Sequence, residues 1–156
     1  MEEGISIKGK VQWKKYRDGK LIAESEWTNN LVMLGADTGK DLILDRLAGT
    51  NTYSLNITHG DIGTGNTAPA ISDTTLTTPV ERTSVALASV SSNTVTFSFF
   101  FADGDLANGT YKEFAVFCDG TATVSTGKIF NHALFASNLV KATGEDITVG
   151  VTFTLT

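Results

Sequence analysis

The stretch ITVGVTFTLT, residues 147–156, alternates between two kinds of side chain from end to end. Its apolar members are Ile147, Val149, Val151, Phe153 and Leu155. Threonine or glycine stands at the positions between them. Alternation with a period of two is the pattern of a strand that buries one face and exposes the other. The stretch therefore predicts a half-buried β-strand.

Similar patterns recur along the chain and predict further strands in 90–102, 111–118 and 128–136. Turn signals at Ser92-Asn93 and Asn108-Gly109 separate them. About seven or eight short strands at such spacing predict an all-β fold, an antiparallel β-sandwich or a jelly-roll-like domain. The pattern does not separate a two-sheet sandwich from a distorted barrel. One short helix is predicted over 37–48, capped by Asp37 or Thr38 and stopped by Gly49.

An N-terminal hairpin is predicted over 5–27, with Asp18-Gly19 at its turn. This dipeptide suits a type I′ turn, in which both central residues have positive φ. Lys10 and Lys14 on the first strand are expected to face Glu24 and Glu26 on the second, as cross-strand ion pairs.

The length of 156 residues predicts a single domain over 1–156. A net charge of -5 argues against nucleic acid as a partner, since phosphate binding needs clustered Lys and Arg. The first residues do not have the pattern of a signal peptide, and no apolar run has the length of a membrane span. The chain is therefore expected to be made in a cytoplasm. Its single cysteine, Cys118, lies in an apolar run and is predicted to be a buried small side chain.

Residues 57–82 contain Gly63-Thr64-Gly65-Asn66, which at first sight resembles a phosphate-binding loop. A P-loop requires a Lys after its glycines, and a dinucleotide-binding loop requires a third glycine in a βαβ unit. Neither is present, so a short strand at 54–58 followed by an irregular loop is expected. Gly63 and Gly65 are expected to supply φ freedom, and Asp73 to accept bonds from nearby backbone N–H groups.

Two other patterns are candidates for chemical sites. Asp103-Gly104-Asp105 with Glu113 resembles part of a calcium loop, but the residues between do not fit one. His59 and His132, with Asp61 or Glu113, form no catalytic motif. We therefore predict no catalytic residues, no cofactor and no metal.

The aromatic residues Trp13, Trp27 and Tyr16 could form a platform that stacks on sugars, but aromatic residues in strands more often belong to a core or an interface. Phe100 lies on an otherwise polar strand face and is expected to meet another chain. Glu81 and Arg82 are expected to pair across the loop or with a neighbouring subunit. The residues predicted to form an interface are Trp13, Trp27, Phe100, Glu81 and Arg82.

Several motifs over about residues 29–156 resemble small β-rich virion proteins of tailed bacteriophages, a class that includes head decoration and tail fibre proteins. The most specific is the Gly-Thr-Gly-x-Thr-Ala-Pro segment at 63–69, followed by Asp73-Thr74 and Glu81-Arg82. The others are Asn29-Asn30-Leu31-Val32, Gly35, Arg46-Leu47-Ala48-Gly49, 93–97 and 108–117. The N-terminal hairpin or arm, 1–28, lies outside this resemblance.

The resemblance implies a non-enzymatic virion component located at the capsid surface and made in the host cytoplasm. The function expected first is that of an accessory decoration, or cement, protein that binds the head lattice. Its partners would be the major capsid protein or another virion protein, and further copies of itself, as in the trimers frequent among similar proteins. A tail, baseplate or fibre component is the first alternative, and a carbohydrate-binding module is the second.

Overall fold

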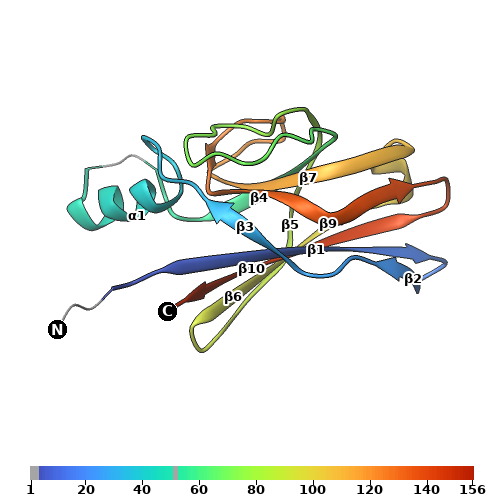
Figure 1. Cartoon of the computed structure of the whole chain (residues 1–156), viewed down its shortest axis with the longest axis horizontal. Helices are drawn as coiled ribbons and strands as arrows, with labels where there is room; N and C mark the ends of the chain where they lie inside the picture. The colour runs from blue at the N-terminus through green and yellow to red at the C-terminus, as the bar shows by residue number, and fades with distance from the viewer. Residues whose placement is uncertain (1–3, 51–52) are drawn as a thin grey trace.

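The computed structural model describes residues 4–50 and 53–156 and shows an all-β chain with one α-helix (Figure 1). The elements in chain order are β1 (Ile7–Arg17), β2 (Lys20–Glu24), β3 (Thr28–Val32), α1 (Gly39–Ala48), β4 (Ile57–Gly63), β5 (Pro79–Ser91), β6 (Thr94–Phe101), the 3-10 turn η1 (Asp103–Asp105), β7 (Gly109–Cys118), β8 (Lys128–Ile129), β9 (Asn131–Lys141) and β10 (Asp146–Leu155).

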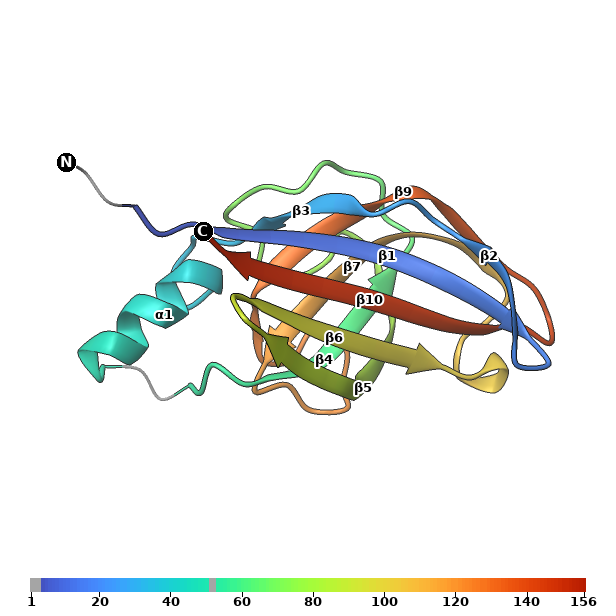
Figure 2. The ribbon, with the colours of Figure 1, turned by 90° about the horizontal axis from the view of Figure 1, so that it is seen from below.

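The strands close into an antiparallel barrel and do not form two stacked sheets. The order around the wall is β10-β6-β5-β4-β7-β9-β3-β1, and β1 pairs with β10 from Ile7↔Leu155 to Tyr16↔Asp146. Figure 2 shows β1 and β10 side by side along this closure. The strands β2 and β8 are additions, paired with β1 and β7. The prediction of an all-β fold is confirmed, and a barrel takes the place of the predicted sandwich or jelly roll.

The barrel interior is filled by the alternating apolar residues that the sequence pattern singled out. Ile147, Val149 and Val151 of β10 are fully buried. They pack in one cluster with aromatic residues of the facing strands, among them Phe99 and Phe114, whose ring centroids are 5.2 Å apart. Such burial is the main stabilising term of the fold.

A second, smaller core lies on the outer face of β7. Ala115 and Phe117 are fully buried there in a cluster with Met33, Leu76 and Ile129. Leu76 belongs to the β4–β5 connection, residues 64–78, and Ile129 follows the β7–β8 connection, residues 119–127. These two loops, visible beside β4 and β7 in Figure 1, form an outer layer, so that β7 is buried on both faces.

The helix α1 lies at one end of the barrel, which we call the helix end (Figure 2). It agrees with the prediction over 37–48, with Thr38 at its N-cap and Gly49 in the left-handed region at its C-cap. Leu42 is its fully buried apolar residue. Within the described residues, no helix has the length and apolar character needed to cross a lipid bilayer.

The N-terminal hairpin forms with the predicted turn, since Asp18 and Gly19 both have positive φ, 50° and 73°. Lys14 pairs with Glu24 at 3.9 Å, whereas Lys10 lies opposite Asn29. Residues 1–28 were expected to form a separate hairpin or arm, but the structure places much of this segment in the barrel. Its first strand, β1, is part of the barrel wall between β3 and β10, and residues 1–3 lie outside the described part.

Two boundaries in the middle of the chain differ from prediction. The strand expected at 54–58 overlaps β4 only at its end, because β4 begins at Ile57 and continues through His59-Gly60-Asp61 to Gly63. The strand β5 begins at Pro79, so the irregular loop is limited to 64–78. Both strands contain small and polar residues that interrupt the alternation of apolar and polar side chains, so the sequence pattern did not show their full length. Gly60 is required inside the barrel, because a side chain there would meet the rings of Phe99 and Phe114.

Candidate functional site

The outer layer is held by a buried carboxylate, Glu113 of β7. Its Oε1 accepts hydrogen bonds from the backbone N–H groups of Gly65 at 3.0 Å and Thr78 at 2.7 Å. Its Oε2 accepts one from the Thr77 N–H at 3.1 Å. Glu113 is fully buried, so these bonds replace the water that the charge has lost. They fix both ends of the 64–78 loop against the barrel.

His132 of β9 extends this arrangement. Its Nε2 lies 2.8 Å from Glu113 Oε2 and its Nδ1 lies 2.7 Å from Asp73 Oδ2. Asp73 also accepts the Ala70 N–H at 2.9 Å, as its predicted local capping role requires. We call Glu113, His132 and Asp73 the Glu113 cluster.

The charges in the Glu113 cluster stabilise one another. Burial by itself lowers the pKa of His132, but the hydrogen bonds and charges of Glu113 and Asp73 outweigh it, so the pKa is raised. Burial raises the pKa of Glu113, but bonds from His132, Thr78 and Thr77 outweigh it, so that pKa is lowered. An imidazolium that donates to two carboxylates fits both shifts.

The Glu113 cluster explains the glycines of the 63–66 segment. A side chain on Gly63 or Gly65 would collide with the Glu113 carboxylate. Neither glycine has positive φ, so the expectation that they supply φ freedom is wrong, and close approach is the reason for them. The Gly65 N–H, which a phosphate-binding loop would offer to a ligand, is already donated to Glu113.

A second buried tie joins β4, β5 and the 119–127 loop. The Arg82 guanidinium pairs with the Asp61 carboxylate through Nε and Nη2. Its Nη1 donates to the Thr126 carbonyl at 2.9 Å and the Thr121 carbonyl at 3.0 Å, and it stacks over the Phe117 ring at 4.6 Å. Burial raises the pKa of Asp61, and the bonds from Arg82 and Ser125 oppose that shift. We call Asp61 and Arg82 with this loop the Arg82 cluster.

The residues weighed for catalysis are placed apart or already bound. His132 and Glu113 meet, but their hydrogen bonds go to each other, to Asp73 and to the 64–78 backbone. His59 lies beside Arg82, and burial followed by the Arg82 charge lowers its pKa. Burial, followed by the Asp119 charge, raises the pKa of Cys118 to about 12, which leaves a protonated thiol.

The acidic residues weighed for calcium do not converge. Asp103 pairs with Lys141 at 2.8 Å, and Asp105 accepts the Ala102 N–H. Glu113 belongs to the cluster on β7. Sequence reasoning missed a different acidic group on α1 and just before it, where carboxylate oxygens of Asp37, Asp41 and Asp45 lie within 4.8 Å of one another. Of these, Asp37 pairs with Lys128 and Asp41 accepts the Asp37 N–H.

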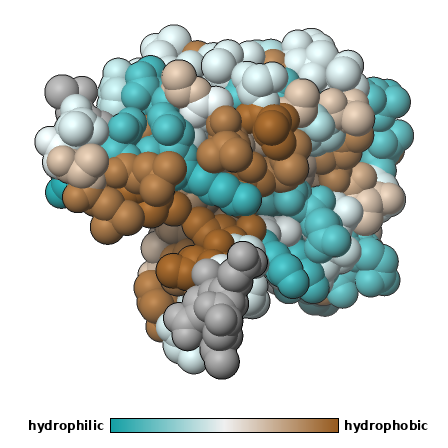
Figure 3. All heavy atoms as spheres, turned by 60° about the vertical axis from the view of Figure 1, so that its left-hand side comes forward, coloured by the Kyte–Doolittle hydropathy of each residue, from teal (hydrophilic) through white to brown (hydrophobic). Residues whose placement is uncertain are grey.

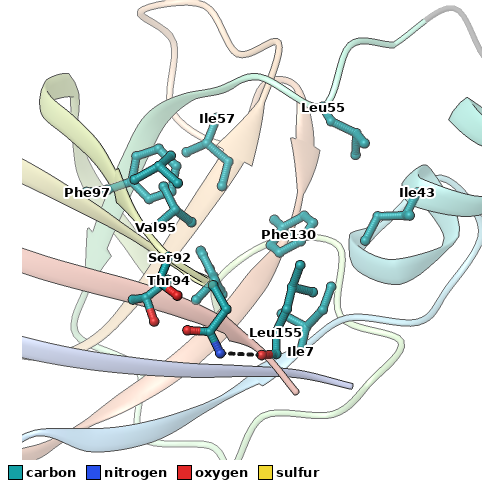
Figure 4. Close-up of a pocket in the computed structure, with 13 residues that line it drawn as sticks. Ile7, Ile43, Leu55, Ile57, Ser92, Thr94, Val95, Phe97, Phe130 and Leu155 are labelled. Carbon is teal, nitrogen blue, oxygen red and sulfur yellow. Dashed lines mark hydrogen bonds between the residues drawn. The ribbon is translucent and has the colours of Figure 1, made fainter. Parts of the chain in front are cut away.

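The helix end of the barrel holds an apolar pocket of about 370 Å³ (Figure 4). We call it the barrel-end pocket. Figure 3 shows hydrophobic residues gathered on this side of the molecule. Its walls come from both ends of the chain, the β5–β6 hairpin, the residues before β4, and α1. The lining residues are Ile7, Ile43, Leu55, Ile57, Val90, Ser92, Asn93, Thr94, Val95, Phe97, Phe130, Phe153 and Leu155.

None of the lining residues of the barrel-end pocket carries a charge. Its size and apolar walls are in the range of sites that bind ligands or side chains of a partner. Sequence reasoning missed it, because the lining residues come from several predicted strands, one turn and the helix, and no local pattern brings them together. A second depression, of about 450 Å³, is polar and lies over His59, Glu81 and Asp105.

The five residues predicted to form an interface have different environments. Trp13 is only 6% exposed, and its Nε1 donates to the Ser137 carbonyl, so it belongs to the barrel core. Arg82 is buried in its own cluster. Trp13 and Arg82 were predicted to contact another subunit, and this prediction is wrong for both, because their side chains are buried within the chain. Trp27 and Phe100 are 43% and 44% exposed, and Glu81 is half-buried, with its carboxylate accepting the Arg82 N–H.

The burial of Trp13 also separates the aromatic residues considered for sugar stacking. Trp27 lies outside the barrel, with its ring over Gly150 of β10, while Trp13 faces the interior. The two rings therefore do not share one exposed face. No family model, curated protein or solved structure matches this chain.

Proposed function

We propose that this chain is a non-catalytic structural protein of a tailed-bacteriophage particle, and that it decorates the head by binding the capsid lattice. The sequence motifs at 63–69 and 29–35 support the class of particle, as a resemblance. The chemistry of the described residues agrees with a structural role, since the buried charges of Glu113, His132, Asp61 and Arg82 are used to hold the chain's own loops.

One observation carries the binding role: the apolar surface at the helix end. Val90 and Leu155 of the barrel-end pocket are 77% and 50% exposed, and Leu44 and Leu47 of α1 are 60% and 81% exposed. Exposed apolar side chains that line a hollow, as Val90 and Leu155 do, are typical of protein interaction sites. We assign the contact with the particle to this end, with Phe100 as the candidate for contact between copies.

Immunogold electron microscopy of intact particles tests the assignment. The antibody should recognise the β1–β2 turn around Asp18 and Gly19, because it is exposed and docking at the helix end would leave it accessible. Label distributed over the head is the expected result. Label confined to the tail would replace decoration by a tail or baseplate role. Particles without label, where the same antibody detects the denatured chain in their proteins, would contradict the head assignment because the exposed turn would be hidden.

A further inference from the structure

The strand β5 changes partners halfway along its length. Its first part pairs with β4, from Gly63↔Pro79 to His59↔Ser84. Its second part pairs with β6, from Val85↔Phe99 to Ser91↔Thr94. Among the described residues, no strand pairs with β5 on the β4 side beyond Ser84. Residues 86–91 therefore have one free edge, which we call the free β5 edge.

A free edge of this kind presents backbone hydrogen-bonding groups. In an antiparallel ladder every second residue directs its N–H and C=O away from its partner strand. The β5–β6 turn at Ser92-Asn93 keeps the ladder with β6 in register up to Ser91. The groups on the opposite side of 86–91 are left to solvent. Unpaired edges readily accept another strand, and proteins usually cover or charge them. The free β5 edge carries no charged residue.

The barrel-end pocket lies along the same edge. Val90 of β5 lines it. Val95 and Phe97 of β6, labelled in Figure 4, line it as well. The opposite wall is formed by Leu55, by Ile57 at the start of β4, and by Ile43 of α1. The pocket therefore occupies the space where β5 has separated from β4. Backbone groups along one side and an apolar hollow beside them are the two elements of strand addition.

We propose that the free β5 edge binds an extended segment of a partner polypeptide as an additional strand, with alternate apolar side chains of that segment in the barrel-end pocket. The backbone of residues 86–91 supplies the hydrogen bonds. Val90, Phe97 and Ile57 contact the inserted side chains. The polar side chains between them would face solvent, since successive residues of a strand point to opposite faces. The inference does not depend on the assignment to a phage particle.

The edge and the pocket together favour a single extended segment from a different chain. A second copy would offer its own residues 86–91, in which the alternate positions beside Val90 are alanines, so that little apolar side chain would enter the pocket. Two copies would also bring together two chains of net charge -5. A small apolar molecule would fill the hollow but leave the backbone edge unused.

A synthetic heptapeptide of alternating Val and Thr, with Lys at each end, tests the proposal. It is titrated into the ¹⁵N-labelled full chain and followed by NMR chemical shifts and amide hydrogen exchange. We expect shifts at 53–58 and 86–97 and slower exchange of alternate amides within 86–91. The control peptide has the same sequence with N-methylated Val residues, which removes the N–H donors. It should bind at least tenfold more weakly.

Two substitutions on the same strand form a matched pair. Val90→Asp places a charge in the pocket, whereas Val80→Asp changes a residue in the part of β5 that is paired with β4 and does not line the pocket; both side chains are exposed, at 77% and 42%. We expect Val90→Asp to weaken binding of the peptide at least tenfold and Val80→Asp to change it less than twofold. If Val90→Asp fails to fold, Val90→Thr of similar shape takes its place.

Three results would overturn the proposal. The first is no binding of the heptapeptide at millimolar concentration. The second is equal binding of the N-methylated control, which would mean that the hollow alone is recognised. The third is a parent chain that associates with itself through residues 86–91 and becomes monomeric on Val90→Asp, since the occupant would then be a second copy.

Discussion

The outer face of β7 and the helix end of the barrel differ in what their side chains are used for. On the outer face of β7, the Glu113 carboxylate is buried, and it accepts hydrogen bonds from three backbone N–H groups and lies within hydrogen-bond distance of the His132 ring. At the helix end, the lining of the barrel-end pocket is uncharged, and Val90 remains exposed beside an unpaired strand edge. The residues with the most evident chemistry therefore hold the fold, and the plainer apolar surface is available to a partner.

The largest effect is expected from Glu113→Gln. The amide keeps the size of the side chain but removes its charge, and its NH2 group replaces one of the two acceptor oxygens, so that some of the buried donors lose their partner. We expect a loss of about 3–5 kcal/mol in the free energy of unfolding. Urea denaturation followed by circular dichroism measures it.

The control for Glu113→Gln is Glu24→Gln, because Glu24 forms the exposed pair with Lys14. This change should cost less than about 1 kcal/mol. If Glu113→Gln and Glu24→Gln lower the free energy of unfolding by the same amount, the buried cluster contributes no more to stability than an exposed ion pair.

Gly65→Ala is expected to have the next largest effect. The added methyl group would meet both the Glu113 carboxylate and the Thr77 side chain. Overpacking of this kind costs about 1–3 kcal/mol, measured by the same denaturation curves. Gly104→Ala is the control, since a Cβ there meets no atom within 4 Å, and it should change stability by less than about 0.5 kcal/mol. If Gly65→Ala leaves the free energy of unfolding unchanged, the 64–78 loop can move to accept the added methyl group and is not tightly packed against Glu113.

The pH dependence of unfolding should show the Glu113 cluster directly. The raised pKa of His132 adds stability that is complete below its ordinary value of 6.5 and is lost as pH rises through the folded value. The lowered pKa of Glu113 adds stability that is complete above its ordinary value of 4.5 and is lost as pH falls through the folded value. Both contributions are complete between these ordinary values.

The free energy of unfolding should therefore be highest between about pH 4.5 and pH 6.5 and should decrease below and above this interval. In His132→Gln the fall above pH 6.5 should be reduced, because the titrating ring is gone. An unchanged alkaline slope in this variant would assign the dependence to another group.

The smallest effect on stability is expected for Phe100→Ser, on the exposed face of β6. Because the ring is 44% exposed, the free energy of unfolding should change by less than about 1 kcal/mol. If Phe100 joins copies of the chain, the variant should instead lower the mass measured by sedimentation. A parent and variant of the same mass and stability would exclude this residue as an anchor between copies.

The strand periodicities, the helix at 39–48 and the turn at Asp18-Gly19 could be predicted, because each depends on residues close together in the sequence. Closure of the barrel could not, since it depends on the pairing of β1 with β10 at opposite ends of the sequence. A sandwich and a barrel require the same local alternation, and only this long-range pairing separates them.

The Glu113 cluster was missed for a similar reason, since Asp73 and His132 are 59 positions apart. One signal was present. Glu113 stands directly before the apolar run Phe114–Cys118, where both faces of the strand are apolar. A carboxylate in such a strand is buried only if it is paired, and two histidines were available in the sequence. The barrel-end pocket gave no signal, because apolar residues around a hollow and in a core have the same pattern.

The pairing of β1 with β10 has a consequence for synthesis of the protein on the ribosome. Before β10 is made, β1 lacks the partner that runs along it from Ile7 to Tyr16, and Val11 and Trp13 have no complete interior to enter. The barrel can close only after residues 146–155 have left the exit tunnel. Because this pairing spans nearly the whole chain, its loop-closure entropy makes it a slow, late step. Until then the nascent chain exposes unpaired strands, and its yield in cells should depend on chaperones that bind unfinished chains.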